Sequence, residues 1–315
     1  MDYFDGCNFE SGLDYDQGIA ALSSSLIYSS EQSASRWLSL TQDDEYPYYR
    51  IEKNQLNQLL QDHSLSDLKE AKSMVCLGAA DSEKEMTIAR YIARSKSELE
   101  ITLVDSSPAL LDHALLKFAA LNVGKAGGVL LDARESGSFR SAIGVGEMMC
   151  GKPRLFSAFG NIGGSYQELS LVRSLHGVMH AGDRFIFGAH LKSRCEMEPY
   201  YPPYHSKAYY RHMASALHDA GVDRALGSFA TEVKETKDTL VDVIEIYFDL
   251  ARKAKILSKR LSSSEQPLLI NRILVDVSCK YSMSFLKLEL RKFGWSEVKY
   301  WISKCNSNVI FLCKK

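Results

Sequence analysis

The sequence predicts a doubly wound α/β domain with a mostly parallel sheet, and two observations lead to this prediction. Between about residues 71 and 190, short runs of β-branched and aromatic residues alternate with longer helical patterns. Near the C-terminus a helical pattern is followed by two strand patterns that a polar turn separates. Parallel strands need crossover helices, and a sheet covered on both faces has continuous apolar strands. We therefore expect a Rossmann-like sheet that ends in an antiparallel hairpin.

Five strands with their helices are expected in the first part of this sheet. Ser107 precedes Pro108, a pair that is typical of a helix start because serine caps and proline fits the first turn. The alternation implies right-handed crossovers between parallel strands. The predicted strands are 73–77, 100–105, 127–133, 154–159 and 183–190, and the predicted helices are 82–95, 107–122 and 165–180.

The alternation of strand and helix breaks after residue 190. The stretch "EMEPYYPPYHSKAYYRHM" is rich in proline and tyrosine, so it cannot continue the sheet. Strand patterns return at 239–252 and 268–281, followed by a helix at 282–295 and strands at 297–303 and 309–315. The predicted domains are a helical segment 1–70 that forms part of a substrate cap, a core 71–190, an inserted cap region 191–275, and a C-terminal segment 276–315 that completes the core.

Composition and charge argue against several classes of protein. The net charge is −1 and no basic stripe is present, so a nucleic-acid partner is not expected. No apolar run approaches the length of a membrane span, and the acidic start lacks the apolar region of a secretory signal. The seven cysteines are scattered and form no C-x-x-C motif, which favours a reducing cytoplasm. We expect no metal site, since His176 and His180 lack the glutamate of an H-E-x-x-H motif.

The stretch "MVCLGAADSEKE" (74–85) has the outline of a nucleotide-binding turn but contains one glycine, Gly78. Dinucleotide folds use several glycines there, because backbone amides must approach a pyrophosphate at the helix start. Here Ala79 and Asp81 occupy such positions, and the acidic Glu83 at the helix start disfavours phosphate. We therefore expect a ligand with an adenosine and an amino-acid tail but no phosphate, which is S-adenosylmethionine.

Carboxylates at the ends of two successive strands agree with this ligand. Asp105 ends the second strand, where it can accept both ribose hydroxyls, and Asp132 ends the third, where it can accept the adenine amine. The alternative is that either aspartate only caps the helix that follows.

Four stretches resemble the histidine-specific methyltransferase family, which includes the histidine Nα-methyltransferases of ergothioneine synthesis. "EYPYYRIE" (45–52) is similar to the family's E-Y-Y-P-T-R-T-E, and "LGAADSEK" resembles L-G-S-G-S-S-R-K. "RLFSAFGNIGGSY" and "AGDRFIFGAHL" resemble R-L-V-A-F-L-G-S-T-I-G-N and P-G-D-x-x-L-L-G-x-D-L, and "VDVSCKYS" (275–282) is similar to T-E-x-S-x-K-Y. The resemblance spans roughly residues 25 to 313.

This resemblance implies a methyltransferase that uses S-adenosylmethionine, with site residues at matching positions. The implied catalytic residues are Asp276 and Tyr46. The implied cofactor-binding residues are Gly78, Ala79, Lys84, Asp105, Ser106, Asp132, Ala133, Phe159 and Gly160. The implied substrate-binding residues are Tyr28, Tyr46, Tyr49, Ser165, Tyr201, Asp276 and Ser278.

Two departures from the family pattern fall on the implied substrate pocket. The asparagine of I-G-N is replaced by Ser165, and the glutamate of E-x-S by the shorter Asp276. We therefore expect the substrate to be an amino acid or related small amine other than histidine. Two alternatives remain: an enzyme that transfers the aminocarboxypropyl group of the same cofactor, and a non-catalytic partner protein with a methyltransferase-like fold.

Overall fold

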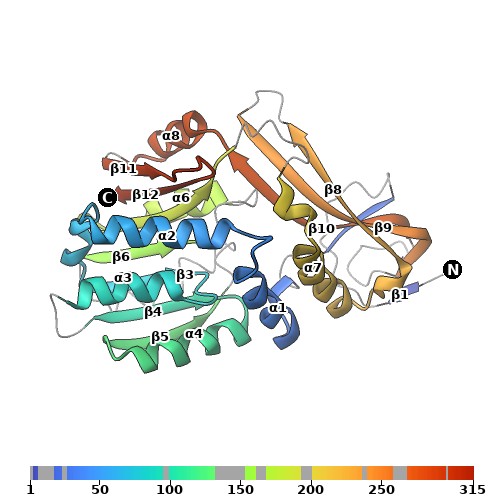
Figure 1. Cartoon of the computed structure of the whole chain (residues 1–315), viewed down its shortest axis with the longest axis horizontal. Coiled ribbons are helices and arrows are strands. Elements are labelled where there is room, and N and C mark those ends of the chain that lie inside the picture. Colours follow the sequence, from blue (N-terminus) through green and yellow to red (C-terminus); the bar gives the residue numbers. More distant parts are fainter. Residues whose placement is uncertain are drawn as a thin grey trace. The chain divides into compact units, whose positions relative to one another are not determined.

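The computed structural model describes residues 3–5, 18–22, 27–94, 99–131, 153–160, 168–192, 201–235, 240–257, 268–295 and 297–315. The chain forms two compact units (Figure 1). Unit 1 comprises Met1–Tyr46, Cys195–Glu235 and Val243–Ser278, and unit 2 comprises Pro47–Arg194, Thr236–Asp242 and Cys279–Lys315.

Unit 2 is built on a seven-stranded sheet with the order β11-β12-β7-β6-β3-β4-β5. The pairs from β7 to β5 are parallel, whereas β12 is antiparallel to both β7 and β11. The chain order reverses between β3 and β6, which is where ligands bind in open α/β sheets. The strands are β3 (Ser73–Leu77), β4 (Glu100–Asp105), β5 (Lys125–Leu130), β6 (Arg154–Ala158), β7 (Arg184–His190), β11 (Glu297–Ile302) and β12 (Asn308–Lys314).

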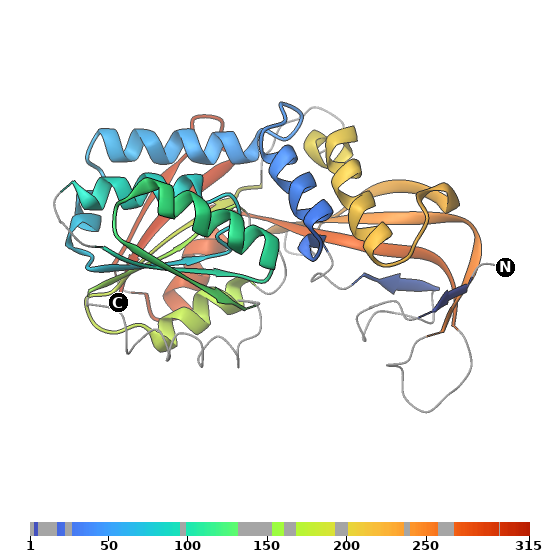
Figure 2. The same cartoon turned by 90° about the horizontal axis from the view of Figure 1, so that it is seen from below.

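Helices cover both faces of this sheet, as the buried strands require. Figure 2 shows α2 (Tyr48–Gln61), α3 (Glu83–Ala93) and α4 (Pro108–Leu121) along one face, and α6 (Glu168–Val178) and α8 (Met283–Lys292) along the other. The sequence-based fold class, a doubly wound Rossmann-like sheet with a C-terminal antiparallel hairpin, is confirmed. Every helix within the described ranges is too short or too polar to cross a membrane.

The predicted elements of unit 2 agree closely with the observed ones. β3 and β4 have the predicted bounds, and α4 begins after Ser107, whose Oγ accepts the backbone N–H of Leu110 at 3.3 Å. The third strand differs, since β5 starts at Lys125 rather than residue 127 and ends at Leu130. Its pairing with β4 begins where Lys125 lies opposite Glu100, before the apolar run that marks the strand in the sequence.

Unit 1 contains a second sheet with the order β1-β9-β10-β2, in which β8 also pairs with β9. Its strands are β1 (Tyr3–Asp5), β2 (Ile19–Ala21), β8 (Gly227–Glu235), β9 (Val241–Leu257) and β10 (Leu268–Tyr281). Figure 1 shows the helices α1 (Glu31–Thr41) and α7 (Lys207–Asp219) side by side, and η5 (Pro202–His205) precedes α7. The expectation of only helices and loops in the first 70 residues was wrong. β1 and β2 are three-residue strands whose pairing depends on β9 and β10.

The first domain boundary also differs from the expected one. Residues 47–70 were expected in the cap, but they fall in unit 2. The reason is that Leu56, Leu59 and Leu60 of α2 belong to the same buried apolar cluster as Met74 of β3 and Ile310 of β12. Helix α2 therefore completes the core under the sheet.

Candidate functional site

The loop after β3 follows a backbone path that favours glycine, although it contains only one. Gly78, Ala80 and Ser82 have φ values of +63°, +40° and +56°. The N–H groups of Gly78 and Ala79 both donate to the Val104 carbonyl, at 2.8 and 3.2 Å, so the loop is attached to the end of β4. The loop thus makes the turns of a glycine-rich loop with alanine and serine, which raises the local backbone strain.

The start of α3 is occupied by carboxylates of the chain itself. The Glu83 N–H points to Asp81 Oδ1 at 3.4 Å, and the Glu85 carboxylate accepts its own backbone N–H. Asp81 also accepts the Tyr49 hydroxyl in a short hydrogen bond. An anion at this helix start would meet these carboxylates, so the geometry disfavours phosphate.

Charges around this helix start are partly compensated. Lys117 Nζ lies 2.6 Å and Lys53 Nζ 3.4 Å from the Glu83 carboxylate, and the hydrogen bond from Lys117 is the main reason that the pKa of Glu83 is lowered. Burial raises the pKa of Glu85 to about 8, with smaller contributions from Asp81 and Glu52. The acidic start predicted from the sequence therefore carries less net charge than its composition indicates.

Asp105, at the end of β4, connects the two predicted cofactor loops. One carboxylate oxygen accepts the Ala80 N–H and the other accepts the Ser107 N–H, both at 2.9 Å. Ser107, rather than Asp105, is the N-cap of α4. The Asp105 side chain is buried at this point, and its carboxylate is an acceptor only. Ser106 follows it and is half-buried.

The remaining described cofactor candidates form one cluster in unit 2. The buried Lys84 Nζ is ion-paired with the buried Glu52 carboxylate, and it lies 4.3 Å from the ring centroid of Tyr49 and 5.5 Å from that of Phe159. The Gly160 N–H donates to Glu52 Oε2 at 2.9 Å. The structure therefore brings Tyr49, expected in the substrate pocket, together with the cofactor candidates. Asp132, Ala133 and Ser165 lie outside the described residues.

A cluster of tyrosines in unit 1 surrounds the predicted E-x-S position. The rings of Tyr46, Tyr204 and Tyr209 lie 5.0 to 6.1 Å apart between centroids. Asp276 and Ser278 project from one face of β10, because side chains two apart on a strand share a face. We call these five residues the tyrosine cluster.

Hydrogen bonds join the tyrosines to that strand. The Tyr209 hydroxyl donates to Asp276 Oδ2 in a short hydrogen bond, and Tyr204 and Ser278 exchange one at 2.9 Å. Burial, followed by the charge of Asp276, raises the pKa of Tyr209, so its hydroxyl stays protonated. The cluster thus presents one carboxylate among three phenol rings.

The two other tyrosines predicted to bind substrate in unit 1 are Tyr28 and Tyr201. Tyr28 packs edge-on against Trp37, with 5.5 Å between ring centroids, and against the buried His212 at 5.6 Å. Burial lowers the pKa of His212 to about 3. Tyr201 is buried at the start of η5 with a φ of +55°. Both therefore have structural packing in addition to any role in binding.

Tyr204, Tyr209 and Glu52 were not among the predicted site residues, although Glu52 ends the stretch "EYPYYRIE" that resembles the family motif. The two tyrosines were indistinguishable from their neighbours in a tyrosine-rich stretch, because the phase of η5 and α7 decides which rings point to β10. The burial of Glu52 could have been predicted from its spacing on the helix. It stands four residues after Tyr48 and four before Leu56, on the buried face of α2.

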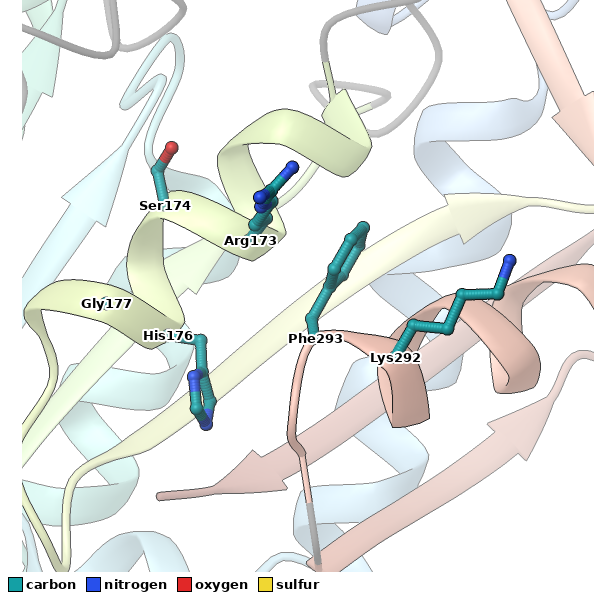
Figure 3. A pocket seen from close by; sticks show the side chains of 6 residues that line it. All are labelled: Arg173, Ser174, His176, Gly177, Lys292 and Phe293. Carbon is teal, nitrogen blue, oxygen red and sulfur yellow. The ribbon is translucent and has the colours of Figure 1, made fainter.

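A pocket of about 540 Å³ lies elsewhere on unit 2, beside α6 and α8. It is lined by Arg173, Ser174, His176, Gly177, Lys292 and Phe293, none of which was a predicted site residue. Figure 3 shows Arg173 and Phe293 pointing to the same side while His176 points to the other. Lys292 is paired with Glu289 at 2.6 Å. Among the residues that the structure describes, no group of His, Cys, Asp and Glu could hold a metal ion.

Comparison with known proteins identifies no family for this chain. No family model matches it, and neither does any curated protein. Three similar solved structures are an S-adenosylmethionine-dependent methyltransferase of Clostridium acetobutylicum, the CcbJ methyltransferase of Streptomyces caelestis, and the magnesium protoporphyrin IX methyltransferase of Synechocystis PCC 6803 with bound SAH.

All three similarities are remote. The identities are 11%, 14% and 8%, and the TM-scores are 0.41, 0.40 and 0.46. The matches cover 81%, 81% and 89% of this chain and 89%, 88% and 93% of the others. The fold class of unit 2 therefore rests on its own strand order, in which an antiparallel β12 is inserted beside β7.

Proposed function

We propose that this chain is an S-adenosylmethionine-dependent methyltransferase that acts on an amino acid or related small amine. The observation that carries the proposal is the edge formed by loop 78–82 and Asp105. There a buried carboxylate adjoins a glycine-poor loop, and the helix start beside it is already occupied by carboxylates. This combination favours ribose hydroxyls and disfavours a pyrophosphate.

The chemistry of the described residues fits this cofactor. Asp105 is proposed to accept the ribose hydroxyls, because a carboxylate offers two acceptor oxygens, and Asp132 is proposed for the adenine amine. The Lys84 ammonium complements the carboxylate of the methionine tail, and Gly160, with a φ of +76°, presents a bare backbone beside it. When bound, the cofactor supplies a methyl group activated on a sulfonium.

The tyrosine cluster supports an amine as the methyl acceptor. Three phenol rings and a carboxylate are a favourable environment for an ammonium group, through cation–π attraction and a charge-assisted hydrogen bond. Asp276 is half-buried and held by the Tyr209 hydroxyl, so it is already oriented. We propose that Asp276 and Tyr46 act on the acceptor and that Ser278, Tyr28, Tyr201 and Ser165 help to bind it.

The contribution of these residues to methyl transfer is mainly positional. An acceptor nitrogen must present an unshared electron pair, so its proton has to leave before transfer. Asp276 can accept that proton or hold a second, protonated site of the substrate. Orientation of the acceptor by the tyrosines is worth several orders of magnitude in rate, because it replaces a chance encounter with a fixed approach.

Calorimetry with S-adenosylhomocysteine, the demethylated cofactor, tests the cofactor assignment. The wild-type protein is expected to bind S-adenosylhomocysteine and not NAD. Asp105→Asn is expected to weaken binding about tenfold or more, since it removes the charge that ribose hydroxyls donate to. Asp112→Asn, an exposed carboxylate on the following helix, is the matched control and should bind normally. Binding of NAD in place of S-adenosylhomocysteine would contradict the proposal.

Kinetics with a panel of amines and amino acids test the acceptor assignment. Asp276→Asn is expected to raise KM or lower kcat without loss of S-adenosylhomocysteine binding. Asp249→Asn, which removes an ion-pair partner of Arg272 elsewhere in unit 1, serves as the control. Product mass decides the reaction. A mass gain of one methylene unit indicates methyl transfer, and a gain of an aminocarboxypropyl chain indicates the other transferase. If no acceptor gives a product, the proposal that the chain is an enzyme is contradicted.

A further inference from the structure

Glu52 is a buried carboxylate on the apolar face of α2 that the proposed reaction does not require. It has no measurable exposure, and it accepts a short hydrogen bond from the Lys84 ammonium and a second from the Gly160 N–H at 2.9 Å, both on Oε2. Its Oε1 is buried without a hydrogen-bond partner. Such a group is costly to bury, so its retention needs an explanation beyond packing.

The sheet leaves space for this carboxylate at one position. A Cβ atom on Gly188 of β7 would lie 1.6 Å from Glu52 Oε1 and 2.8 Å from Cδ. Any residue other than glycine at 188 would therefore displace the carboxylate from its present place. Glu52 thus connects four elements: α2, the start of α3 through Lys84, the end of β6 through Gly160, and β7 through Gly188.

The position of Lys84 depends on this contact. Its side chain is 3% exposed, and its ammonium lies over the rings of Tyr49 and Phe159, which leave it little contact with water. Aromatic faces attract a cation but do not accept its hydrogen bonds as strongly as a carboxylate does. Without Glu52, the ammonium would be a buried charge with weak compensation, and the side chain would be driven to leave its place.

We infer that Glu52 is a positioning residue for the amino-acid tail of the cofactor. It fixes the positions of the Lys84 ammonium and of the Gly160 backbone at the carboxyl edge of the sheet, where we place the tail. Glu52 does not touch the ligand; it acts through Lys84 and Gly160. The inference rests on the proposed function, because it assumes that a charged amino-acid tail binds beside Lys84.

Calorimetry with two ligands separates this role from a purely structural one. S-adenosylhomocysteine carries the charged tail, whereas adenosine does not. Glu52→Gln keeps the shape of the side chain and removes its charge. We expect this variant to weaken S-adenosylhomocysteine binding by about tenfold to a hundredfold and to leave adenosine binding within about twofold of wild type. Glu52→Asp, which restores the charge with a shorter reach, should recover part of the loss.

A second buried ion pair of unit 2 provides the matched control. The Arg154 and Asp183 side chains are 1% and 0% exposed and lie 2.7 Å apart at the N-terminal ends of β6 and β7, away from the carboxyl edge of the sheet. Asp183→Asn is expected to lower the unfolding midpoint but to bind both ligands normally once folded. Gly188→Ala is an independent test, because it leaves both charges in place and displaces the carboxylate. Gly188→Ala should reproduce the selective loss of S-adenosylhomocysteine binding. This variant keeps the inference testable if Glu52→Gln fails to fold.

The outcomes distinguish a failure of the proposed function from a failure of the role inferred for Glu52. Wild-type protein that binds neither ligand contradicts the proposed function itself. Wild-type protein that binds both, with Glu52→Gln and Gly188→Ala losing adenosine as much as S-adenosylhomocysteine, leaves the function and overturns the inference. Normal S-adenosylhomocysteine binding by folded Glu52→Gln overturns it as well.

Discussion

Ala80 and Ser82 show, at the scale of single residues, how the loop after β3 makes its turns with a single glycine. Both adopt left-handed φ values, which cost an alanine or serine roughly 1–2 kcal/mol relative to glycine. Glycine also gives the unfolded chain more conformational entropy, which lowers the free energy of unfolding by about 0.5–1 kcal/mol. We expect Ala80→Gly to stabilise the protein by about 0.5 kcal/mol in urea denaturation, since relief of strain outweighs the entropy.

Ala79 is the internal control for that substitution. It is buried and its φ is not positive, so glycine there gains no relief. Ala79→Gly should therefore destabilise the protein by about 0.5–1 kcal/mol or more, because it loses both a methyl contact and backbone restriction. If the two substitutions change the free energy of unfolding equally, the claim that the backbone at Ala80 is strained is contradicted.

Glu85 makes the stability of the protein depend on pH. Burial raises its pKa from 4.5 to about 8, so between these values the folded state holds a proton that the unfolded state has lost. Stability therefore falls as the pH rises through this window. Glu85→Gln is expected to remove this loss, so that the variant gains stability over wild type at pH 8 but not at pH 5, as measured by urea denaturation.

Glu83 supplies the opposite sign for comparison. Its pKa is lowered, chiefly by the hydrogen bond from Lys117, so its contribution is present above the unfolded-state pKa and is lost as the pH falls. Glu83→Gln should therefore differ from wild type more at pH 7 than at pH 3. If Glu83→Gln and Glu85→Gln change the pH profile in the same direction, the assignment of Glu85 is incorrect.

Residue positions could be predicted from the sequence where the strand patterns define them. Asp105, Asp276 and Ser278 lie where the strand patterns place them. Tyr204 and Tyr209 could not be selected, because the rotation of α7 and η5 determines which side chains reach β10. The left-handed path of Ala80 was also beyond prediction, since alanine rarely adopts it and only the surrounding contacts impose it.

At the scale of elements, helix caps can be tested directly. The Ser282 Oγ caps α8 by accepting the Phe285 N–H at 3.2 Å. Ser282→Ala is expected to lower the free energy of unfolding by about 1 kcal/mol, because the amide loses its acceptor. Ser284 is exposed in the first turn, and its Oγ lies 3.0 Å from the Ser282 Oγ. Ser284→Ala leaves the hydrogen bond from the Phe285 N–H in place, so it should change the free energy of unfolding by less than about 0.5 kcal/mol. Equal losses would mean that Ser282 has no special role.

The length of an element and the source of its partners decided how well it could be predicted. β3, β4 and α4 carry strong apolar patterns and their own start signals, so their bounds agree with the prediction. β1 and β2 are short and owe their existence to pairing with β9 and β10, more than 200 residues later in the chain. β8 has a mixed pattern that only pairing with β9 converts into a strand.

At the scale of the whole molecule, hydrogen exchange can locate the proposed cofactor site. S-adenosylhomocysteine is expected to slow exchange in peptides that contain residues 78–82, 105–107 and 159–160, which meet at the carboxyl edge of the sheet in unit 2. Ligand at 100 times its dissociation constant should also stabilise the folded state by about 2.7 kcal/mol. NAD is the control ligand and should do neither. Protection confined to the helices around the pocket of Figure 3 would place the ligand elsewhere.

The division into two units was only partly readable from the sequence. The break in rhythm after residue 190 marked the inserted region, but the return of residues 47–70 to unit 2 depends on leucines that join a core assembled from both ends of the chain. The local sequence pattern of an amphipathic helix such as α2 predicts its buried face but not which of the two cores that face will pack against.

The place of β12 in the sheet has a consequence for biosynthesis. β7 needs β12 as its outer neighbour, yet residues 191–307 are translated before that neighbour begins. At ordinary ribosomal speed this interval lasts on the order of ten seconds. Throughout it the nascent polypeptide exposes an apolar strand edge, the kind of surface that chaperones bind and that promotes aggregation in crowded cells.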